Sequence, residues 1–392
     1  MTGISADVVI VGGGLAGMTT AYYLAKAQVP SVVVERDAIG SHASGFAYGG
    51  LSPLSGFGIP GPHADIAQDG MSLHRELGKS LLEETGIDVD FRERASLALA
   101  LTEADVRRLQ AALPWQQRQP GYAARWLDAA EARRVEARIA DETQGATLIE
   151  GGAGVEPYRL VLALTRAAER LGARVRHGRA IGLRRDGGRV TGVVLERETI
   201  ACSTVVFALG PWSAEVADWI GVPIDVRPLK GQILRLQAPG PPVECSVGWG
   251  HHYATTKTDG LLWAGTTEEE AGFDEESTSA ARDEIGAALV RMLPAMADAQ
   301  IAHQTACLRP VAARIAAMDS GRSTTRAMAT PMTAGGAPAR RTTDSMVGDS
   351  TLARPITPTS ETSSRAKLAH ACLVVGGAAW IASSEAASGG KK

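Results

Sequence analysis

The sequence predicts an α/β fold in which a Rossmann-like dinucleotide-binding domain is joined to a second, α+β domain built on an antiparallel sheet. A glycine-rich fingerprint follows a short β-branched run at the amino terminus. Apolar and polar residues alternate, with turns between them, in the segment from Pro228 to Gly265. The chain has 392 residues, which is more than one ordinary domain needs.

The composition is that of an ordinary globular protein. Hydrophobic residues make up 45% of the chain and charged residues 21%, and the formal net charge is -3. This balance gives no electrostatic reason to approach nucleic acid or anionic lipid, so we expect neither as a partner. The cysteines include no CxxC pair, and we therefore expect neither a disulfide framework nor a metal site.

No targeting segment is expected. The first apolar run has no basic stretch before it and leads directly into a glycine-rich loop, which is not typical of a signal peptide. The apolar stretch from Cys372 to Ala382 is shorter than the roughly 20 residues of a membrane-spanning helix. We expect a cytoplasmic protein without a membrane segment, and the oligomeric state stays open.

The fingerprint is Gly12-Gly13-Gly14-Leu15-Ala16-Gly17, directly after the strand predicted at Val8–Val11. In this motif the first glycine allows a tight turn, and the second lets a pyrophosphate approach the backbone. The third, Gly17, lets the following helix lie close to the strand. The phosphates of a dinucleotide would then lie at a helix N-terminus.

A helix and a second strand complete the motif's context. Met18–Ala27 has a helical composition, and Ser31–Val34 is a buried strand that ends in Glu35. A carboxylate at this distance from the fingerprint accepts hydrogen bonds from both ribose hydroxyls and repels a 2′-phosphate, which favours FAD or NAD over NADP. The alternative is a glycine-rich turn that binds nothing.

After Glu35 the chain departs from the pattern of an NAD dehydrogenase. Gly40–Gly45 is a loop of small residues instead of a third regular βα unit. We expect it to pass close to a pyrophosphate and a flavin ring, with Ser44 donating a hydrogen bond. A flexible surface loop is the alternative.

Residues 71–149 indicate mainly helices, with one strand at Ser96–Leu101, and they interrupt the nucleotide-binding domain. A helix and two strands then bring the chain back to it. The second of these strands, Thr204–Ala208, is followed by Gly210 and Trp212, where a cofactor would lie.

The second domain is predicted from period-two patterning. Strands are expected at Pro228–Leu236, His251–Tyr253, Leu261–Gly265 and Ala302–Pro310, and a helix at Ala280–Leu293. Strands of this kind, separated by turns, indicate an antiparallel sheet. We expect this sheet to carry the substrate site.

Taken in order, these motifs resemble the FAD-dependent oxidoreductases of the D-amino-acid oxidase superfamily, and within it the glycine oxidase and sarcosine oxidase branch. The resemblance runs from about Val8 to Pro310. Besides the fingerprint and Glu35, it is carried by Ala43-Ser44-Gly45, Val155-Glu156-Pro157, Leu209-Gly210-Pro211-Trp212, Pro228-Leu229-Lys230-Gly231-Gln232, Gly265-Thr266-Thr267-Glu268 and Leu308-Arg309-Pro310.

The resemblance implies a non-covalently bound FAD and oxidation of the CH–NH bond of glycine, a D-amino acid or a small secondary amine. Hydride passes to flavin N5, the imine hydrolyses in water, and oxygen or another acceptor takes the electrons, with hydrogen peroxide formed from oxygen. Two alternatives stay open: a dehydrogenase subunit that passes electrons to a partner, and an inactive remnant of such an enzyme.

The resemblance also implies the domain boundaries. Residues 5–78 and 150–220 would form a discontinuous FAD-binding domain, to which part of 308–392 is a candidate addition. Residues 79–149 and 221–307 would form the substrate domain.

Three residues are implied to face the substrate. Arg309 would grip a carboxylate with its guanidinium, Tyr253 would add a hydrogen bond, and His252 would line the pocket. Only one of His251 and His252 can point inward, because neighbours on a strand face opposite sides. The alternatives are an arginine in a structural ion pair, a tyrosine packed in the core and an ordinary histidine. The implied cofactor-binding residues are Gly12, Gly14, Leu15, Ala16, Gly17, Glu35, Arg36, Ser44, Gly45, Val175, Gly210 and Trp212.

Cys307 stands where sarcosine oxidases attach their flavin covalently. The flanking Leu308-Arg309-Pro310 matches the non-covalent branch instead. We therefore expect a buried, inert cysteine.

The resemblance ends after Val311. Relatives continue with an Asp-Gly-Pro segment, a strand and a Gly-His-Gly turn that contacts the flavin, whereas residues 311–392 are rich in Ala, Ser, Thr and Arg. Their composition predicts a disordered tail. The abrupt change suggests a shifted reading frame or a replaced C-terminus, and only Leu373–Gly377 is similar to the family's terminal strand.

Overall fold

A run of four apolar β-branched residues forms the centre of the nucleotide-binding domain. This strand, β1 (Val8–Val11), is buried along its whole length. It pairs in parallel with β2 (Ser31–Glu35) and β13 (Thr204–Phe207), and β9 (Arg174–His177) extends the sheet beyond β2. Parallel strands covered on both faces have such continuous apolar runs. The computed structural model describes residues 5–56, 59–61, 63–312 and 380–383.

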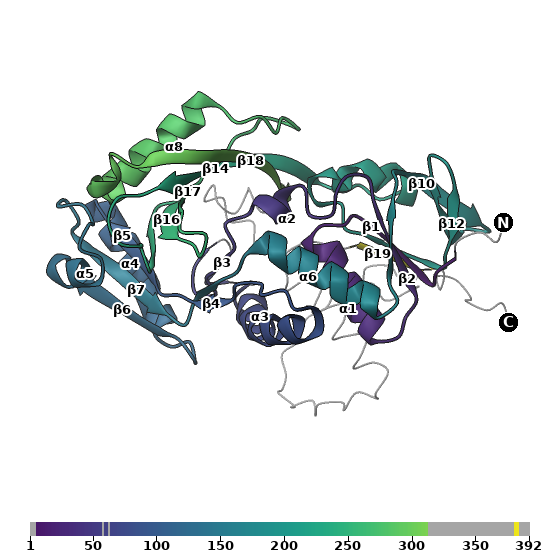
Figure 1. The fold of residues 1–392 in the computed structure, drawn as a ribbon, viewed down its shortest axis with the longest axis horizontal. Helices are drawn as coiled ribbons and strands as arrows, with labels where there is room; N and C mark the ends of the chain where they lie inside the picture. The colour runs from purple at the N-terminus through teal and green to yellow at the C-terminus, as the bar shows by residue number, and fades with distance from the viewer. Residues whose placement is uncertain (1–4, 57–58, 62, 313–379, 384–392) are drawn as a thin grey trace, which may run out of the picture.

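Helices cover one face of this sheet and a small sheet covers the other (Figure 1). On the helix side, α1 (Leu15–Lys26), α3 (Ala64–Thr85) and α6 (Pro157–Arg170) share one apolar core with alternate residues of β1. The other residues of β1 pack against an antiparallel sheet. Its strands are β10 (Ala180–Asp186), β11 (Arg189–Leu195) and β12 (Thr199–Ala201). The predicted Rossmann-like domain is confirmed.

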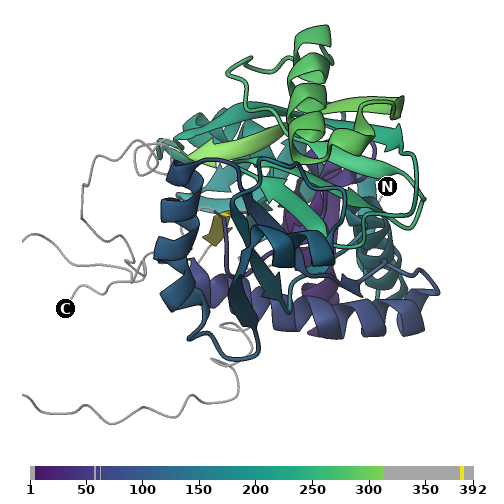
Figure 2. The same cartoon turned by 90° about the vertical axis from the view of Figure 1, so that its left-hand side faces the viewer.

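The second domain is an eight-stranded sheet with α8 (Ser279–Met292) on one face, as Figures 1 and 2 show. In order across the sheet its strands are β18 (Gln300–Ala312), β14 (Val226–Gln237), β17 (Leu262–Gly265), β16 (His252–Thr256), β15 (Ser246–Trp249), β5 (Ser96–Ala100), β7 (Gly145–Glu150) and β6 (Ala123–Asp128). All neighbours are antiparallel except β15 and β5. The predicted antiparallel sheet of an α+β domain is confirmed, with this one parallel pair as the difference.

Shorter elements complete the chain. They are α2 (Ala43–Phe46), α4 (Glu103–Gln116), α5 (Ala129–Val135), α7 (Ala217–Ile220), the 3-10 helices η1 (Gly210–Val216) and η2 (Pro294–Met296), and the strands β3 (Gly50–Leu51), β4 (Arg92–Glu93) and β8 (Ala153–Gly154). The three last strands form a small sheet of their own, β3-β8-β4.

The two longest strands connect the domains. β14 and β18 pair without interruption from Val226 opposite Ala312 to Gln237 opposite Gln300, with one register shift. In Figure 1 they run along the top of the molecule from the substrate domain to the nucleotide-binding domain. Val226, at the start of β14, packs against the core beneath β1. This pair therefore sets where the two domains face each other.

The region of residues 71–149 contains more strand than its sequence predicts. The strands β6 and β7 were not predicted, because β7 is buried in five of its six positions and shows no alternation. The predicted domain boundary at residue 78 falls inside α3. Leu81 and Val89 lie beyond that boundary but belong to the core that α1 and α6 share, so this helix packs with the nucleotide-binding domain.

Part of the segment after residue 311 is described. Val311 and Ala312 end β18, and β19 (Trp380–Ser383) pairs antiparallel with β13, as the edge strand of the nucleotide-binding sheet. Trp380–Ser383 form a strand where the sequence predicts a disordered tail, because the open edge of β13 forms backbone hydrogen bonds with them. The strand expected at Leu373–Gly377 and the rest of the expected disordered tail lie outside the described residues.

Three cysteines of the described region, Cys202, Cys245 and Cys307, are buried and free. Burial raises the pKa of each to about 11, so they are protonated thiols at neutral pH. None of the helices described here is long and apolar enough to cross a membrane.

The assignment of α3 to the nucleotide-binding core is testable with two neighbouring leucines. Leu81 is 0% exposed and Leu82 is 46% exposed. We expect Leu81→Ala to lower the free energy of unfolding by about 2–5 kcal/mol, because it leaves a cavity in the core. Leu82→Ala should change it by about 0.5 kcal/mol or less. Urea denaturation measures both, and equal effects would show that α3 does not pack as described.

Candidate active site

The turn between β1 and α1 depends on two glycines. Gly12 has a φ of +112°, and a Cβ there would lie 2.2 Å from the carbonyl oxygen of Ala208, which directly follows β13. A Cβ on Gly17 would lie 1.9 Å from the carbonyl oxygen of Gly12. Both positions therefore require glycine, and together they bring the first turn of α1 against the end of β1.

A cleft opens where β1, β2 and β13 end. The predicted cofactor residues that line it are Gly12, Gly14, Leu15, Ala16, Glu35, Arg36, Ser44, Gly210 and Trp212. The cleft thus combines the N-terminus of α1 with the ends of three parallel strands, where open α/β sheets bind their ligands.

Glu35 closes the cleft at the end of β2. Its two carboxylate oxygens accept hydrogen bonds from the backbone N–H of Gly13 at 2.6 Å and of Asp37 at 2.8 Å. A carboxylate has about four acceptor positions, so each oxygen can still accept a hydroxyl hydrogen from a ribose. The two backbone bonds hold the side chain in place for that contact.

The small-residue loop packs on the N-terminus of α1. Ser44 Oγ accepts a hydrogen bond from the backbone N–H of Leu15 at 2.9 Å, and its hydroxyl hydrogen is left for a ligand. Gly45 does not line the cleft. A Cβ there would lie 2.1 Å from the carbonyl oxygen of Gly40, so its role in this structure is to let the loop fold on itself.

Val175 is not brought to the cleft. It lies in the middle of β9, opposite Val33, and packs on the helix side of the sheet. The strand continues to His177, so the residues that reach the cleft come later in the chain. They are Gly178, Arg179 and Ala180.

Trp212 is held between charged and aromatic side chains. The guanidinium of Arg36 lies 4.4 Å from the centre of its ring, and the ring of Phe273 stacks at 5.8 Å between centroids. The ring of His42 meets it edge-on at 4.7 Å. Phe273 follows β17 in the substrate domain, so this contact joins the two domains beside the cleft.

His42 makes a second connection between the domains. Its ring nitrogens lie 3.0 Å from Asp37 Oδ2 and 3.0 Å from Glu275 Oε1. Burial alone would lower the pKa of His42, but the hydrogen bonds and charges of the two carboxylates outweigh it and raise the pKa. Phe273 and Glu275 were not predicted from the sequence, because no local pattern marks residues that meet partners far away in the chain; His42 and Glu275 are separated by 233 positions.

Arg309 and Tyr253 lie on one face of the substrate-domain sheet. Tyr253, Gly265, Ile233 and Thr305 are opposite one another on four successive strands, and Arg309 follows Thr305 by four residues. Since side chains alternate along a strand, all of them point to the same side. The register therefore brings together the two residues expected to bind a carboxylate.

The guanidinium of Arg309 is fixed by its neighbours. Nη2 donates a hydrogen bond to the carbonyl oxygen of Thr267 at 2.9 Å, and Nη1 lies 3.4 Å from Glu268. Nε is buried and has no hydrogen-bond partner among the described residues. A Cβ on Gly231 would lie 3.1 Å from Nη2, so the glycine gives the guanidinium its space.

Tyr253 extends across the same face. Its hydroxyl oxygen would lie 2.7 Å from a Cβ on Gly265, and its ring packs on that of Tyr48 at 4.0 Å between centroids. Burial raises the pKa of Tyr253, and the charge of Arg309 acts in the opposite direction. The hydroxyl groups of Tyr48 and Ser246 form a hydrogen bond of 2.8 Å. Tyr48 was not predicted as a site residue, because it follows the small-residue loop without a motif of its own.

His252 does not join this group. It shares its face of β16 with Ala254, which packs under α8, and its ring stacks on Trp249. The prediction that His252 lines the substrate pocket is therefore not supported by the geometry, because the register gives the inner face to Tyr253. Cys307 lies on the inner face, opposite Gly231, as a buried thiol.

Comparison with known proteins gives the class. Residues 7–330 match the DAO family, described as FAD dependent oxidoreductase, so the chain belongs to this family and is an FAD-dependent oxidoreductase.

Particular relatives narrow this class. Glycine oxidase of Pseudomonas aeruginosa is 30% identical over 309 residues, 78% of this chain and 83% of that protein. The crystal structure of glycine oxidase from Geobacillus kaustophilus has a TM-score of 0.75 and 28% identity, covering 79% of this chain and 84% of that one. Hydrogen cyanide synthase subunit HcnC of Pseudomonas aeruginosa is 27% identical over 341 residues, 78% of this chain and 82% of that protein. These matches support the glycine and sarcosine oxidase branch.

The described residues fit the adenosine diphosphate half of FAD. Gly14, the N-cap residue of α1, has no side chain and lines the cleft, and a helix N-terminus attracts a pyrophosphate. Glu35 has acceptor positions left for a ribose, and Ser44 has a hydroxyl hydrogen to donate. FAD therefore fits this cleft on the chemistry of its lining.

Two glycines of the fingerprint should respond differently to alanine. Gly17→Ala places a methyl group against the backbone of Gly12, and we expect it to lower the free energy of unfolding by about 3 kcal/mol. Gly14→Ala meets only Ser44 Oγ, at 3.2 Å, and should cost about 1 kcal/mol or less while weakening FAD binding by about 10-fold or more. Denaturation and flavin fluorescence titration separate the effects. Equal FAD affinity of Gly14→Ala and the unaltered protein would contradict the assignment.

The contacts of His42 predict a pH dependence. Because the pKa of His42 is raised above its ordinary value of 6.5, its contribution to stability is complete below that pH and is lost as the pH rises through the raised pKa. We expect His42→Gln to cost about 0.2–1 kcal/mol near pH 6 and less at pH 9. Urea denaturation at both values measures this, with the exposed His303→Gln as control. A cost that does not fall with pH would rule out the charged interaction.

Proposed function

We propose that the protein oxidises the CH–NH bond of glycine, a small D-amino acid or a small secondary amine. The observation that carries this proposal is the position of Arg309. Pro310 lines the cofactor cleft, so Arg309 stands one residue from it, on the face that Tyr253 shares. A carboxylate bound there would hold the reacting carbon next to the cleft. The similarity to glycine oxidases supports the same substrate class.

Arg309 would bind the substrate carboxylate. Its contacts with Thr267 and Glu268 leave Nε without a partner among the described residues, and a charge-assisted hydrogen bond from a buried donor is strong. Tyr253 would donate a second hydrogen bond, because its raised pKa keeps the hydroxyl protonated at neutral pH. The packed rings of Tyr48 and Tyr253 fill the space beside this site and favour a small group at Cα.

When bound, FAD supplies the acceptor for the hydride that leaves Cα. The contribution of this chain is to place the substrate and to keep its amine in position. Such positioning supplies a large share of the reduction of the activation barrier in reactions of this kind. Hydrolysis of the imine in water would then release the product. With oxygen as electron acceptor the second product would be hydrogen peroxide.

A dehydrogenase subunit is the second candidate, supported by the similarity to hydrogen cyanide synthase subunit HcnC. Oxygen uptake and peroxide formation with glycine, sarcosine, D-alanine and L-alanine, measured after loading with FAD, test the oxidase. We expect turnover with glycine or another small substrate. Flavin reduction without oxygen uptake would support the dehydrogenase, and no reduction by any substrate would overturn both in favour of an inactive remnant.

Two substitutions test the carboxylate site. Arg309→Met removes a charge-assisted contact that substrate and transition state share, so we expect KM to rise and kcat/KM to fall by about 10–100-fold. Tyr253→Phe should lower kcat/KM by about 3–10-fold. Arg282→Met, in an exposed pair on α8, is the control. An unchanged KM in Arg309→Met would show that this arginine does not bind the carboxylate.

A further inference from the structure

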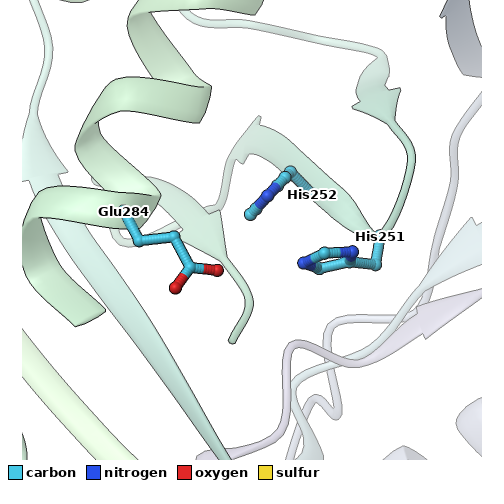
Figure 3. Close-up of side chains that lie close together, drawn as sticks. All are labelled: His251, His252 and Glu284. Carbon is cyan, nitrogen blue, oxygen red and sulfur yellow. The ribbon is translucent and has the colours of Figure 1, made fainter. Parts of the chain in front are cut away.

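A second group of ligand-type side chains lies on the opposite face of the substrate-domain sheet. It consists of His251, His252 and Glu284, and one ligand atom of each lies within 4.8 Å of the others. Figure 3 shows both imidazoles at the start of β16 and the carboxylate reaching toward them from α8. None of the three has a place in the proposed oxidation.

The local backbone brings the two histidines together. Neighbouring residues within a strand point to opposite faces, which would separate them. His251 precedes β16, and Gly250 before it has a φ of +60°, which turns the chain at this point. As a result the two rings lie 4.1 Å apart between centroids. Glu284 comes to them because α8 packs across β16.

The three side chains have ligand atoms to spare. Among the described residues, His252 Nδ1 is buried and has no hydrogen-bond partner.

We propose that His251, His252 and Glu284 bind a divalent transition-metal ion, with Zn²⁺ as the best match. Two imidazoles and a carboxylate suit Zn²⁺, while Mg²⁺ and Ca²⁺ prefer oxygen ligands. In a tetrahedral site with bonds of about 2.0–2.1 Å the ligand atoms stand about 3.3 Å apart. The ligand atoms therefore have to approach by at most about 1.5 Å from their present separation of up to 4.8 Å, which the exposed side chains of His251 and Glu284 allow, and water would take the fourth position.

The ion would join the turn before β16 to α8. His252 directly precedes Tyr253, so the same ion would also fix the start of the strand that carries the proposed substrate contact. Since the unfolded chain does not hold the three ligands together, metal binding should stabilise the folded protein.

Calorimetric titration of the untagged full chain with Zn²⁺ tests the site, and Mg²⁺ serves as the control ion. We expect one Zn²⁺ per chain, a thermal midpoint that rises with Zn²⁺, and no response to Mg²⁺. No saturable Zn²⁺ binding would overturn the proposal.

Variants identify the ligands. His251→Gln and Glu284→Gln should each weaken Zn²⁺ binding by about 10-fold or more. His303→Gln, at an exposed histidine of β18, should bind like the unaltered protein. The side chains of His251 and Glu284 are exposed, so these two variants should fold like the unaltered protein. His252 is partly buried, and His252→Gln is expected to disturb the fold. Equal affinity of all these variants would show an adventitious ion only.

Discussion

The contact between Gly17 and the carbonyl oxygen of Gly12 is the constraint on which the cofactor cleft depends. It fixes the angle at which α1 leaves β1, because no side chain fits between the two backbones. Glu35 and Ser44 are then held by hydrogen bonds to the same turn, one through Gly13 and the other through Leu15. The N-terminus of the helix, an acceptor for ribose and a hydroxyl thus converge on one cleft, where they fit FAD.

A second constraint connects this cleft to the substrate face. The paired strands β14 and β18 belong to the substrate domain at one end and reach the nucleotide-binding core at the other. Pro310 therefore lines the cleft, while Arg309 lies on the same face of the substrate-domain sheet as Tyr253. Trp212 and His42 add side-chain contacts between the domains beside the same opening. The strand pair thus places Arg309, the proposed carboxylate-binding residue, one residue from the lining of the cleft.

Local patterns predicted most of the fold and most of the cleft, because a fingerprint and its following acid act through short separations in the chain. Residues whose place depends on strand register could not be positioned from the sequence. Val175 lies in the middle of β9, before the residues that line the cleft, and His252 lies on the α8 side of β16, since alternation gives Tyr253 the inner side. Contacts made by Phe273 had no sequence signal, because they form only when the domains pack. The cluster of His251, His252 and Glu284 likewise could not be predicted from the sequence, since it joins a turn to a distant helix.

Binding of FAD in the cleft at Gly12–Gly17 can be measured from an absorption spectrum of the purified chain. The protein would be mixed with FAD, separated from unbound flavin and measured in the visible range. We expect about one flavin per chain, with bands shifted from those of free FAD because the ring leaves water. A colourless protein with intact secondary structure would contradict the claim.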